Sequence, residues 1–358
     1  MFEAVDRLLN EAVHEAVVPG FSLCIRSAAS VRHECAGGLA EIRPNPRQAT
    51  RETVWDLASL TKVLASTPIA MTSVAQGEFS LDTPVRSVLP YAHEGITFGH
   101  LLSHSSGAAA WLPFVDRVGP RPSPDTRATV LRMACTHPLE ASPGSRYRYS
   151  DVGFMTLCAA LERMTGKRID ELFETRVRAL SKASLWWGHR GGAATEDCPV
   201  RKRVVVGEVH DLNAWLMGGV STHAGLFGTA RSVAENVAWQ LRALNGNDAE
   251  GLSPAAVQMF LAQSGAGSHR MGWDGVSAGG SAGPQWPTNG FGHLAFTGCS
   301  IWVAPEQDLI AVLLTNRIHP VIEGGAVPDA PIHPRYAAFR VLRQAVHSAI
   351  ARAVGLAG

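Results

Sequence analysis

The hydrophobic pattern at the two ends of the chain predicts strands flanked by helices. Phe2, Val5, Leu9 and Val13 recur at helical spacing among acidic residues, which predicts an amphipathic helix within residues 1–20. Short alternating or β-rich stretches predict strands over residues 21–26, 31–35, 204–206, 292–297, 300–304 and 309–315. A second amphipathic helix is predicted near the C-terminus, over residues 336–353.

The middle of the chain has the periodicity of helices, interrupted by loops rich in Pro and Gly. Helices are predicted over residues 59–77, 97–103, 126–135, 151–165, 169–180 and 230–244, and one more begins at Ser253 and Pro254. Residues 264–291 are rich in Gly and Ser, which predicts a long loop or a pair of short strands around residues 271–273.

This order of elements predicts an α+β fold, in which an antiparallel sheet is flanked by helices and carries an inserted all-helical domain. The sheet domain would be built from both termini, residues 1–64 and 200–358, and the helical domain from residues 65–199. Ligand sites occur preferentially where two domains meet, so we expect the active site at this junction.

Composition and charge exclude several classes of protein. The 358 residues include 32 Lys and Arg against 31 Asp and Glu, a formal net charge of +1 without any long basic run, which argues against a nucleic-acid partner. No apolar run approaches the roughly 20 residues of a membrane span, and the first 20 residues lack the features of a secretion signal. We therefore expect a globular protein of the cytoplasm with no membrane partner, and the sequence predicts no particular oligomeric state.

Six scattered cysteines form no CxxC pair and have mostly apolar neighbours, which predicts buried free thiols instead of metal ligands or disulfides: Cys24, Cys35, Cys135, Cys158, Cys198 and Cys299. Cys24 and Cys35 could face each other across the first hairpin, but a reduced pair fits the expected compartment better.

Ser59 and Lys62 form a Ser-x-x-Lys sequence at the start of a predicted helix. Residues three apart on a helix lie on one face, so the Lys62 amine can lie beside the Ser59 hydroxyl. A serine becomes nucleophilic when a base takes its proton, and a lysine can do so if burial or nearby cations favour its neutral form. Such a pair also occurs by chance on many surface helices, but apolar residues flank this one and predict that it is buried.

Two further segments carry groups suited to the same chemistry. Tyr149 and Asp151 stand at the start of the predicted helix 151–165, where a phenol could shuttle a proton and a carboxylate could hold Lys62. An alternative interpretation is a packing tyrosine beside a helix N-cap. The segment from Gly292 to Gly298 predicts a strand edge that could offer a backbone N–H to an oxyanion, or else an ordinary edge strand.

The order and spacing of these three segments resemble the serine β-lactamase and penicillin-binding-protein superfamily, and within it the class C β-lactamase and family VIII esterase branch. The resemblance runs from about residue 10 to 345. Segments that resemble that branch are DLASLTK at 56–62, HLLSHSSG at 100–107, VHD at 209–211, GGVSTHAGLF at 218–227 and FTG at 296–298.

The resemblance implies a role for each matching residue. Ser59 matches the acylated nucleophile, Lys62 its partner base, and Tyr149 the phenol that relays the proton. Asp151 replaces the usual asparagine and, when ionised, cannot donate a hydrogen bond to a substrate amide. The backbone N–H groups of Ser59 and Phe296 match the oxyanion hole, and no metal or organic cofactor is implied.

His293, Leu294 and Ala295 stand where the family's lactamases have Lys-Thr-Gly. A histidine with an ordinary pKa of about 6.5 is mostly neutral at pH 7, and leucine has no hydroxyl, so we expect an anionic substrate to gain less here. Many esterases of this branch carry His-Thr-Gly. These differences favour a carboxylesterase acting on small neutral esters.

Other motifs are expected to be structural. Ser277 and Ser281 each match Gly-x-Ser-x-Gly, but that elbow must join a strand to a helix, and these residues stand in a Gly/Ser loop. His100 and His104 lack the glutamate of a zinc-protease pair. His210, Asp211 and His223 could suggest a metal site or a triad, but the resemblance places them in the scaffold around the cleft.

Three functions follow in order of preference. The first is a serine carboxylesterase that forms an acyl-enzyme with a small ester. The second is a β-lactamase or D-amino-acid peptidase with an amide substrate. The third is a penicillin-binding-like sensor that does not turn over its ligand, against which the complete set of Ser59, Lys62 and Tyr149 argues.

Overall fold

The computed structural model describes residues 1–188, 191–247, 249–262, 268–321 and 334–356. Within these ranges, a seven-stranded antiparallel sheet runs in the order β3-β2-β1-β12-β11-β10-β9. Its strands are β1 (Gly20–Arg26), β2 (Val31–Glu41), β3 (Arg47–Gln48), β9 (Asp274–Gly275), β10 (Phe291–Leu294), β11 (Ser300–Ala304) and β12 (Leu309–Thr315). The N-terminal strand β1 pairs with the C-terminal strand β12, with Leu23 opposite Leu313, so the sheet is assembled from both ends of the chain.

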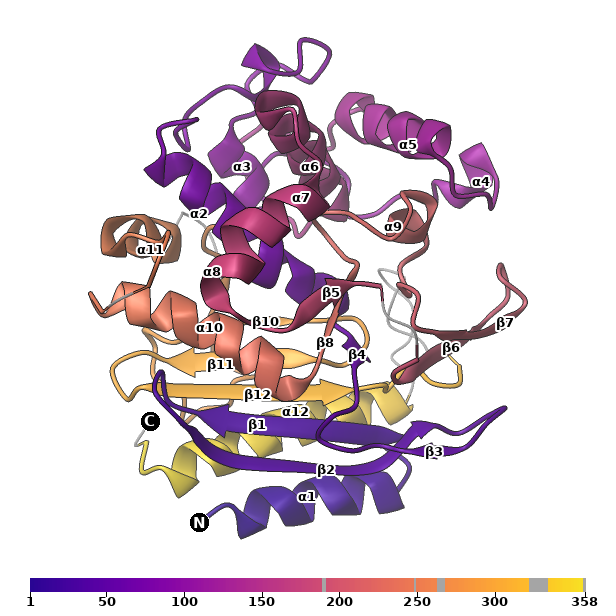
Figure 1. The fold of residues 1–358 in the computed structure, drawn as a ribbon, viewed down its shortest axis with the longest axis vertical. Helices are drawn as coiled ribbons and strands as arrows, with labels where there is room; N and C mark the ends of the chain where they lie inside the picture. The colour runs from indigo at the N-terminus through magenta and orange to yellow at the C-terminus, as the bar shows by residue number, and fades with distance from the viewer. Residues whose placement is uncertain (189–190, 248, 263–267, 322–333, 357–358) are drawn as a thin grey trace.

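Helices cover both faces of this sheet (Figure 1). Alternate residues of β12 point to opposite faces, as strand geometry requires. Leu309, Ala311 and Leu313 pack in a core with the terminal helices α1 (Glu3–His14) and α12 (Pro334–Ala353). The intervening residues of β12 pack in a second core on the other face, against which α10 (Ala230–Leu244) lies.

A helix-rich part lies beyond α10, on the side of the sheet opposite α1 and α12 (Figure 1). Its helices are α2 (Thr67–Ala75), α3 (Phe98–Leu102), α4 (Val115–Val118), α5 (Pro124–Thr136), α6 (Asp151–Thr165), α7 (Ile169–Phe173), α8 (Ala179–Ser181), α9 (Leu212–Leu216) and α11 (Pro254–Leu261). The α+β class is confirmed, and the domain boundaries after residues 64 and 199 stay a prediction.

Several short elements escaped the sequence pattern. Three of these strands, β4 (Trp55–Asp56), β5 (Leu185–Trp187) and β8 (Leu226–Gly228), form a small sheet. A fourth, β6 (Ala194–Cys198), pairs with β7 (Arg203–Val206), the strand predicted over residues 204–206. The predicted helix 59–77 is a 3₁₀ turn at Ala58–Leu60, a π-helical turn at Lys62–Ser66 and then α2. The helix predicted over 169–180 is likewise divided by a π-helical turn at Glu174–Arg178.

Of the two alternatives for residues 264–291, the described part is the long loop, with one short strand, β9, just after residues 271–273. One prediction is corrected, because the strand expected to reach residue 297 ends at Leu294. The chain turns there because the N–H of Ala295 donates to the carbonyl of Cys299 (2.8 Å) and that of Gly298 to Ala295 (3.0 Å), closing a tight connection into β11.

The six cysteines are free thiols, as predicted, and five of them are buried, whereas Cys35 is half-buried. Cys24 lies opposite Glu34 and Cys35 opposite Leu23, so the two side chains point to opposite faces of the sheet and cannot form a bridge across the hairpin. Within the described ranges, no helix is long and apolar enough to cross a membrane.

Candidate active site

Ser59 follows β4 at the start of the helical segment. The side chain of Asp56 holds the backbone of the preceding residue, Ala58, by a hydrogen bond. Ala58 has φ +42°, a left-handed conformation that costs about 1–3 kcal/mol in a residue with a side chain. The buried carboxylate of Asp56 offsets this cost, because it accepts hydrogen bonds from the N–H groups of Ala58 (2.8 Å) and His210 (2.5 Å). Burial raises the pKa of Asp56 to about 6. The Ser59 side chain remains partly exposed.

Lys62 is fully buried directly beneath Ser59. Its Nζ donates to the Ser59 hydroxyl (3.2 Å), to Asp151 Oδ1 (2.6 Å) and to the carbonyl of His223 (3.2 Å). These three acceptors use all the protons of an ammonium group. The predicted contact between Ser59 and Lys62 is therefore present in the structure.

Asp151 changes the expected ionisation of Lys62. Burial lowers the pKa of the Lys62 ammonium, but the charge of Asp151, together with Tyr149, outweighs burial, and the pKa is raised above its ordinary value. The neutral lysine anticipated from burial is therefore not the stable form in the free protein. The sequence expectation that Asp151 orients Lys62 agrees with the 2.6 Å contact.

Tyr149 lies beside this pair and is held by the loop that precedes α6. Its ring centroid is 4.8 Å from Lys62 Nζ and 4.4 Å from the ring of His104. His104 has φ +55°, and its Nδ1 accepts the N–H of Ser150 (3.0 Å), which fixes the residue after Tyr149. Burial raises the pKa of Tyr149, and the opposing charge of Lys62 does not fully offset this, so Tyr149 is a phenol at neutral pH.

The alternative interpretation of residues 149–151, a packing tyrosine beside a helix N-cap, is also partly correct. Ser150 is the N-cap of α6, because its Oγ accepts the N–H of Gly153 (2.8 Å) while donating to the carbonyl of Ala109 (2.6 Å). A single turn therefore caps the helix and presents Tyr149 and Asp151 to Ser59. His104, set aside as structural from sequence, supports this turn.

Phe296 lies in the turn after β10 and lines the same cavity as Ser59. Across the described ranges, no protein acceptor takes a hydrogen bond from the backbone N–H of either Ser59 or Phe296. The hydroxyl of Thr297 donates to the carbonyl of Asp56 (3.0 Å), tying this turn to β4, the strand that precedes the nucleophile. Gly298 is required in the turn, since it has φ +101° and a Cβ there would lie 2.2 Å from Thr315 Oγ1.

His293 is buried in the wall of the cavity, and its Nδ1 donates to the carbonyl of Leu294 (2.7 Å). That bond leaves Nε2 as the acceptor nitrogen, and it has no partner among the described residues. Burial and the nearby charge of Lys62 hold the pKa of His293 well below its ordinary value. His293 is therefore neutral at pH 7, as expected from sequence.

These residues surround a cavity of about 420 Å³. Its wall brings together Ser59, Tyr149, Asp151, His293 and Phe296, five of the six predicted site residues, while Lys62 lies beneath the surface. Further lining residues that the sequence interpretation missed are Tyr147, His269, Asp274, Arg317, Tyr336 and Arg343.

Asp211, His223 and Ser221 form a buried chain of hydrogen bonds. His223 Nε2 contacts Asp211 Oδ1 (2.9 Å), and its Nδ1 contacts Ser221 Oγ (2.8 Å). Ser221 is completely buried, so this arrangement cannot act as a catalytic triad on a substrate. It fixes the carbonyl that accepts a hydrogen bond from Lys62, which agrees with the expectation of a scaffold.

The two candidate serines of the Gly/Ser loop, Ser277 and Ser281, are also structural residues. Trp302 Nε1 donates to Ser281 Oγ (3.2 Å), and neither Ser277 nor Ser281 precedes a helix as a nucleophile elbow must. His100 caps α3, accepting the N–H of Thr97 at Nδ1 (3.2 Å). Among the described residues, Asp6, His33 and Cys35 are close enough together to hold a metal ion. They lie on α1 and β2 and do not line this cavity.

Comparison with known proteins identifies the family. The family model described as Beta-lactamase matches residues 5–327. The protein belongs to the β-lactamase family. It is accordingly an enzyme, a hydrolase with the serine β-lactamase fold, and the resemblance inferred from its motifs is confirmed.

Relatives in this family have differing names. An "N-acetylmuramyl-L-alanine amidase" of Bacillus subtilis strain 168 is 26% identical over 375 residues, covering 91% of this chain and 83% of the relative. A "Putative D-alanyl-D-alanine carboxypeptidase" of Escherichia coli strain K12 is 26% identical over 359 residues, covering 88% and 82%. The structure of "EstCE1, a hydrolase with promiscuous acyltransferase activity" has the same fold, with a TM-score of 0.74, 23% identity, and coverage of 96% and 97%.

Proposed function

We propose that the protein is a carboxylesterase that cleaves its substrate through a covalent acyl-enzyme on Ser59. The observation that carries this proposal is the hydrogen-bonded chain from Ser59 through Lys62 Nζ to Asp151, at 3.2 Å and 2.6 Å, opening into a cavity. A buried lysine between a hydroxyl and a carboxylate provides a route by which the hydroxyl proton can leave.

In the acylation step, Ser59 Oγ attacks the ester carbonyl carbon. The Ser59 proton passes to Lys62 as Lys62 passes a proton to Asp151, so the lysine ends the step as the ammonium it was at the start. The carbonyl oxygen becomes an oxyanion and accepts hydrogen bonds from the N–H groups of Ser59 and Phe296. The C–O bond then breaks, and the departing alkoxide takes a proton from the phenol of Tyr149 or from Asp151.

In the deacylation step, water attacks the acyl-Ser59 ester. If Tyr149 protonated the leaving group, the resulting phenolate takes the proton of the water and Ser59 recovers its proton from protonated Asp151 through Lys62. If Asp151 did so, its carboxylate takes the proton of the water and returns it to Ser59 through Lys62 as the acid product departs. The step returns every group to its starting form and requires no cofactor. Tyr149 and Asp151 are thus assigned as proton carriers, and Lys62 as the bridge between Ser59 and Asp151.

Esters are preferred over β-lactams because the anion-holding residues of the lactamases are replaced. His293 is neutral and Leu294 has no hydroxyl, so this strand offers a β-lactam carboxylate neither a charge nor a hydroxyl donor. Amide cleavage is the second candidate. The amidase and carboxypeptidase names of the two relatives favour it, and the Tyr149 phenol could protonate an amine leaving group.

The test compares initial rates on p-nitrophenyl butyrate, a chromogenic cephalosporin and a D-alanyl-D-alanine peptide, with wild type, Ser59→Ala and the exposed-serine control Ser80→Ala. We expect ester hydrolysis to be fastest, to fall by about 10⁴-fold in Ser59→Ala and to be unchanged in Ser80→Ala. Faster cephalosporin or peptide cleavage would replace the esterase by the second candidate. Equal rates for wild type and Ser59→Ala above the uncatalysed background would contradict Ser59 chemistry, and rates at background for both proteins on all three substrates would favour a sensor.

A further inference from the structure

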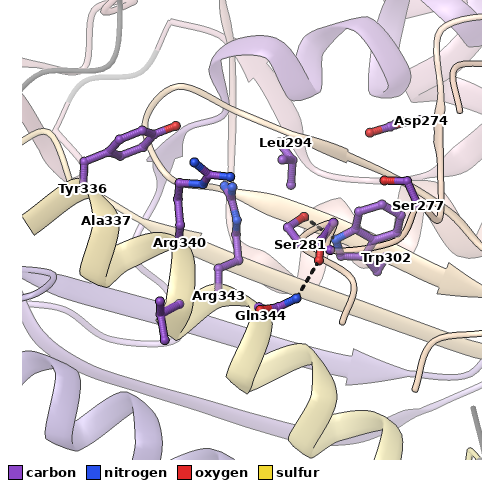
Figure 2. A pocket seen from close by; sticks show the side chains of 13 residues that line it. Asp274, Ser277, Ser281, Leu294, Trp302, Tyr336, Ala337, Arg340, Arg343 and Gln344 are labelled. Carbon is purple, nitrogen blue, oxygen red and sulfur yellow. Dashed lines mark hydrogen bonds between the residues drawn. The ribbon is translucent and has the colours of Figure 1, made fainter. Parts of the chain in front are cut away.

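A second cavity of about 520 Å³ adjoins the one that contains Ser59. The two cavities share Asp274, Leu294, Tyr336 and Arg343 in their walls, so Leu294 and Arg343 stand at the border between them. Figure 2 shows the second cavity between α12, which carries the arginines, and the Gly/Ser loop with Ser277 and Ser281. The loop is anchored to the helix, because Gln344 Nε2 donates to the carbonyl of Gly280 (3.2 Å).

Arg343 is a buried cation without an anionic partner at this border. It is only 7% exposed, and its Nε has no hydrogen-bond acceptor among the described residues. Within those residues, no carboxylate approaches its guanidinium to ion-pair distance, and the guanidinium lies over the ring of Phe339, 5.2 Å from the ring centroid. Buried charges in proteins are normally paired, so this cation is unusual.

The surroundings of Arg343 add further positive charge. Arg340, one helical turn earlier, also lines the second cavity, and Figure 2 shows both guanidinium groups between the side chains of Tyr336 and Leu294. Arg317 lines the Ser59 cavity, packed on the rings of Tyr336 (4.5 Å) and Phe296 (5.1 Å). Burial lowers the pKa of Arg317 and of Arg343 to about 10 each, so both remain charged at pH 7.

The one carboxylate shared by the two walls is engaged elsewhere. Asp274 Oδ1 accepts a hydrogen bond from Ser268 Oγ (2.6 Å) and lies 3.2 Å from His269 Nδ1. In the described part of the chain it makes no ion pair with Arg343 or Arg340. The positive charge at the border is therefore left for a group that the protein itself does not supply.

We propose that the second cavity binds a carboxylate carried by the substrate, with Arg343 as its principal ligand and Arg340 beside it. The apolar side chain of Leu294 lines both cavities, so a hydrocarbon segment would lie against it between this carboxylate and the bond cleaved at Ser59. A guanidinium is the side chain best shaped to hold a carboxylate through two parallel hydrogen bonds. As a substrate assignment, the inference rests on the proposed Ser59 chemistry, and it changes the expected substrate from a neutral ester to an acidic one.

Leu294 and Arg343 together explain how the replacement of Lys-Thr-Gly is compatible with an acidic substrate. The strand β10 supplies neither a cation nor a hydroxyl, and the cation comes from α12 instead, where Arg343, like Leu294, lines both cavities. An anion would thus be held in the second cavity and not against His293. The substrate would be long enough to reach across the border residue.

The first test measures binding without turnover. Ser59→Ala protein is titrated calorimetrically with adipate and with its uncharged dimethyl ester. The titrations are repeated with two double variants, in which Ser59→Ala is combined with Arg343→Met or with Arg343→Lys. We expect adipate to bind at least tenfold more tightly than the diester, Arg343→Met to abolish this difference, and Arg343→Lys to restore part of it. Arg352→Met, an exposed change on the same helix, should leave it unaltered. Equal binding of the two compounds, or a difference that survives Arg343→Met, would overturn the proposal.

The second test uses the active enzyme and two matched pairs of substrates. One pair differs by a carboxylate on the acyl chain, p-nitrophenyl adipate monoester against p-nitrophenyl hexanoate. The other differs on the alcohol, 4-carboxyphenyl butyrate against its methyl ester. We expect kcat/KM to favour the acid at least tenfold in one pair, and this ratio to fall about tenfold in Arg343→Met.

The two tests separate the possible failures. If Ser59-dependent hydrolysis is absent but adipate binds through Arg343, the proposed function fails and the carboxylate site stands. If hydrolysis is Ser59-dependent but neither the binding difference nor the kinetic ratio is found, the carboxylate site is wrong and the proposed function stands. A purely structural Arg343 would lower the melting temperature when replaced by Met, whereas the proposal predicts an unchanged or higher one, since an unpaired buried charge is removed.

Discussion

Asp151 Oδ1 lies 2.6 Å from the fully buried Nζ of Lys62, where the family's usual asparagine would place an uncharged amide. The pair keeps Lys62 protonated, so the proton acceptor available to Ser59 is the Lys62–Asp151 pair as a unit. This relationship distinguishes the site from one that relies on a neutral lysine.

The Lys62–Asp151 pair predicts the pH dependence of a variant. Asp151→Asn removes the charge that raises the pKa of Lys62, so burial then lowers that pKa and a neutral amine forms at lower pH. In the proposed mechanism Lys62 stays an ammonium because Asp151 takes the proton, whereas the variant has to use a neutral Lys62 as the base. We therefore expect the rising limb of kcat/KM against pH to appear at higher pH in Asp151→Asn than in the exposed-residue control Asp82→Asn. Coincident profiles for the two variants would show that Asp151 does not govern the ionisation of Lys62.

The chain from Asp211 through His223 to Ser221 predicts a positioning role for a buried imidazole. His223→Ala leaves Ser221 Oγ and Asp211 without their partner and should lower the free energy of unfolding by about 1–3 kcal/mol. Because the carbonyl that holds Lys62 loses its support, kcat should fall tenfold or more with little change in KM. The measurement pairs urea unfolding with steady-state kinetics, and a stability loss with unchanged kcat would make the chain purely structural.

His347 predicts a loss of stability in acid that is separate from catalysis. Burial and the charge of Arg343 lower its pKa to about 3, whereas the unfolded value is about 6.5. The unfolded state therefore binds the extra proton first, and stability is lost as pH falls from about 6.5 towards 3, by about 2 kcal/mol at pH 5.

The corresponding variant is His347→Gln, which keeps a hydrogen-bonding group near Ser300 Oγ, now 3.0 Å from the imidazole. Urea unfolding at pH 7 and pH 5 should show a loss about 2 kcal/mol smaller in His347→Gln than in wild type. The exposed His14→Gln should behave as wild type. If His347→Gln loses as much stability as wild type, the depressed pKa is not a property of this histidine.

Periodicity located the long elements because a core face repeats regularly along them. The helices α6 and α10 and the strands β11 and β12 have the predicted limits at each end. The strands β4, β5 and β8 have two or three residues each, too few for any alternation to appear, and they exist because distant segments pair with one another. The sequence pattern did not predict them, because they form through contacts between residues that are far apart in the chain.

The contacts of the site likewise divide into a local one, which the sequence predicts, and long-range ones, which it does not. Ser59 and Lys62 are three residues apart, so one helical turn explains their contact, whereas Asp151 and the carbonyl of His223 reach Lys62 through the tertiary fold. Arg343 did leave a signal in the sequence, since it interrupts the apolar stripe of the last helix between Phe339 and Val346. A cation on a buried helix face indicates either a partner or a ligand, and sequence alone does not distinguish them.

The measurement that tests the central claim most directly is the site of covalent modification by a fluorophosphonate ester, which mimics the tetrahedral intermediate. The wild-type protein is labelled, digested and analysed by mass spectrometry, with the Ser59→Ala protein in parallel. The account predicts a single adduct on Ser59 and none in Ser59→Ala. An adduct on Ser221, Ser277 or Ser281, or labelling that persists in Ser59→Ala, would contradict it.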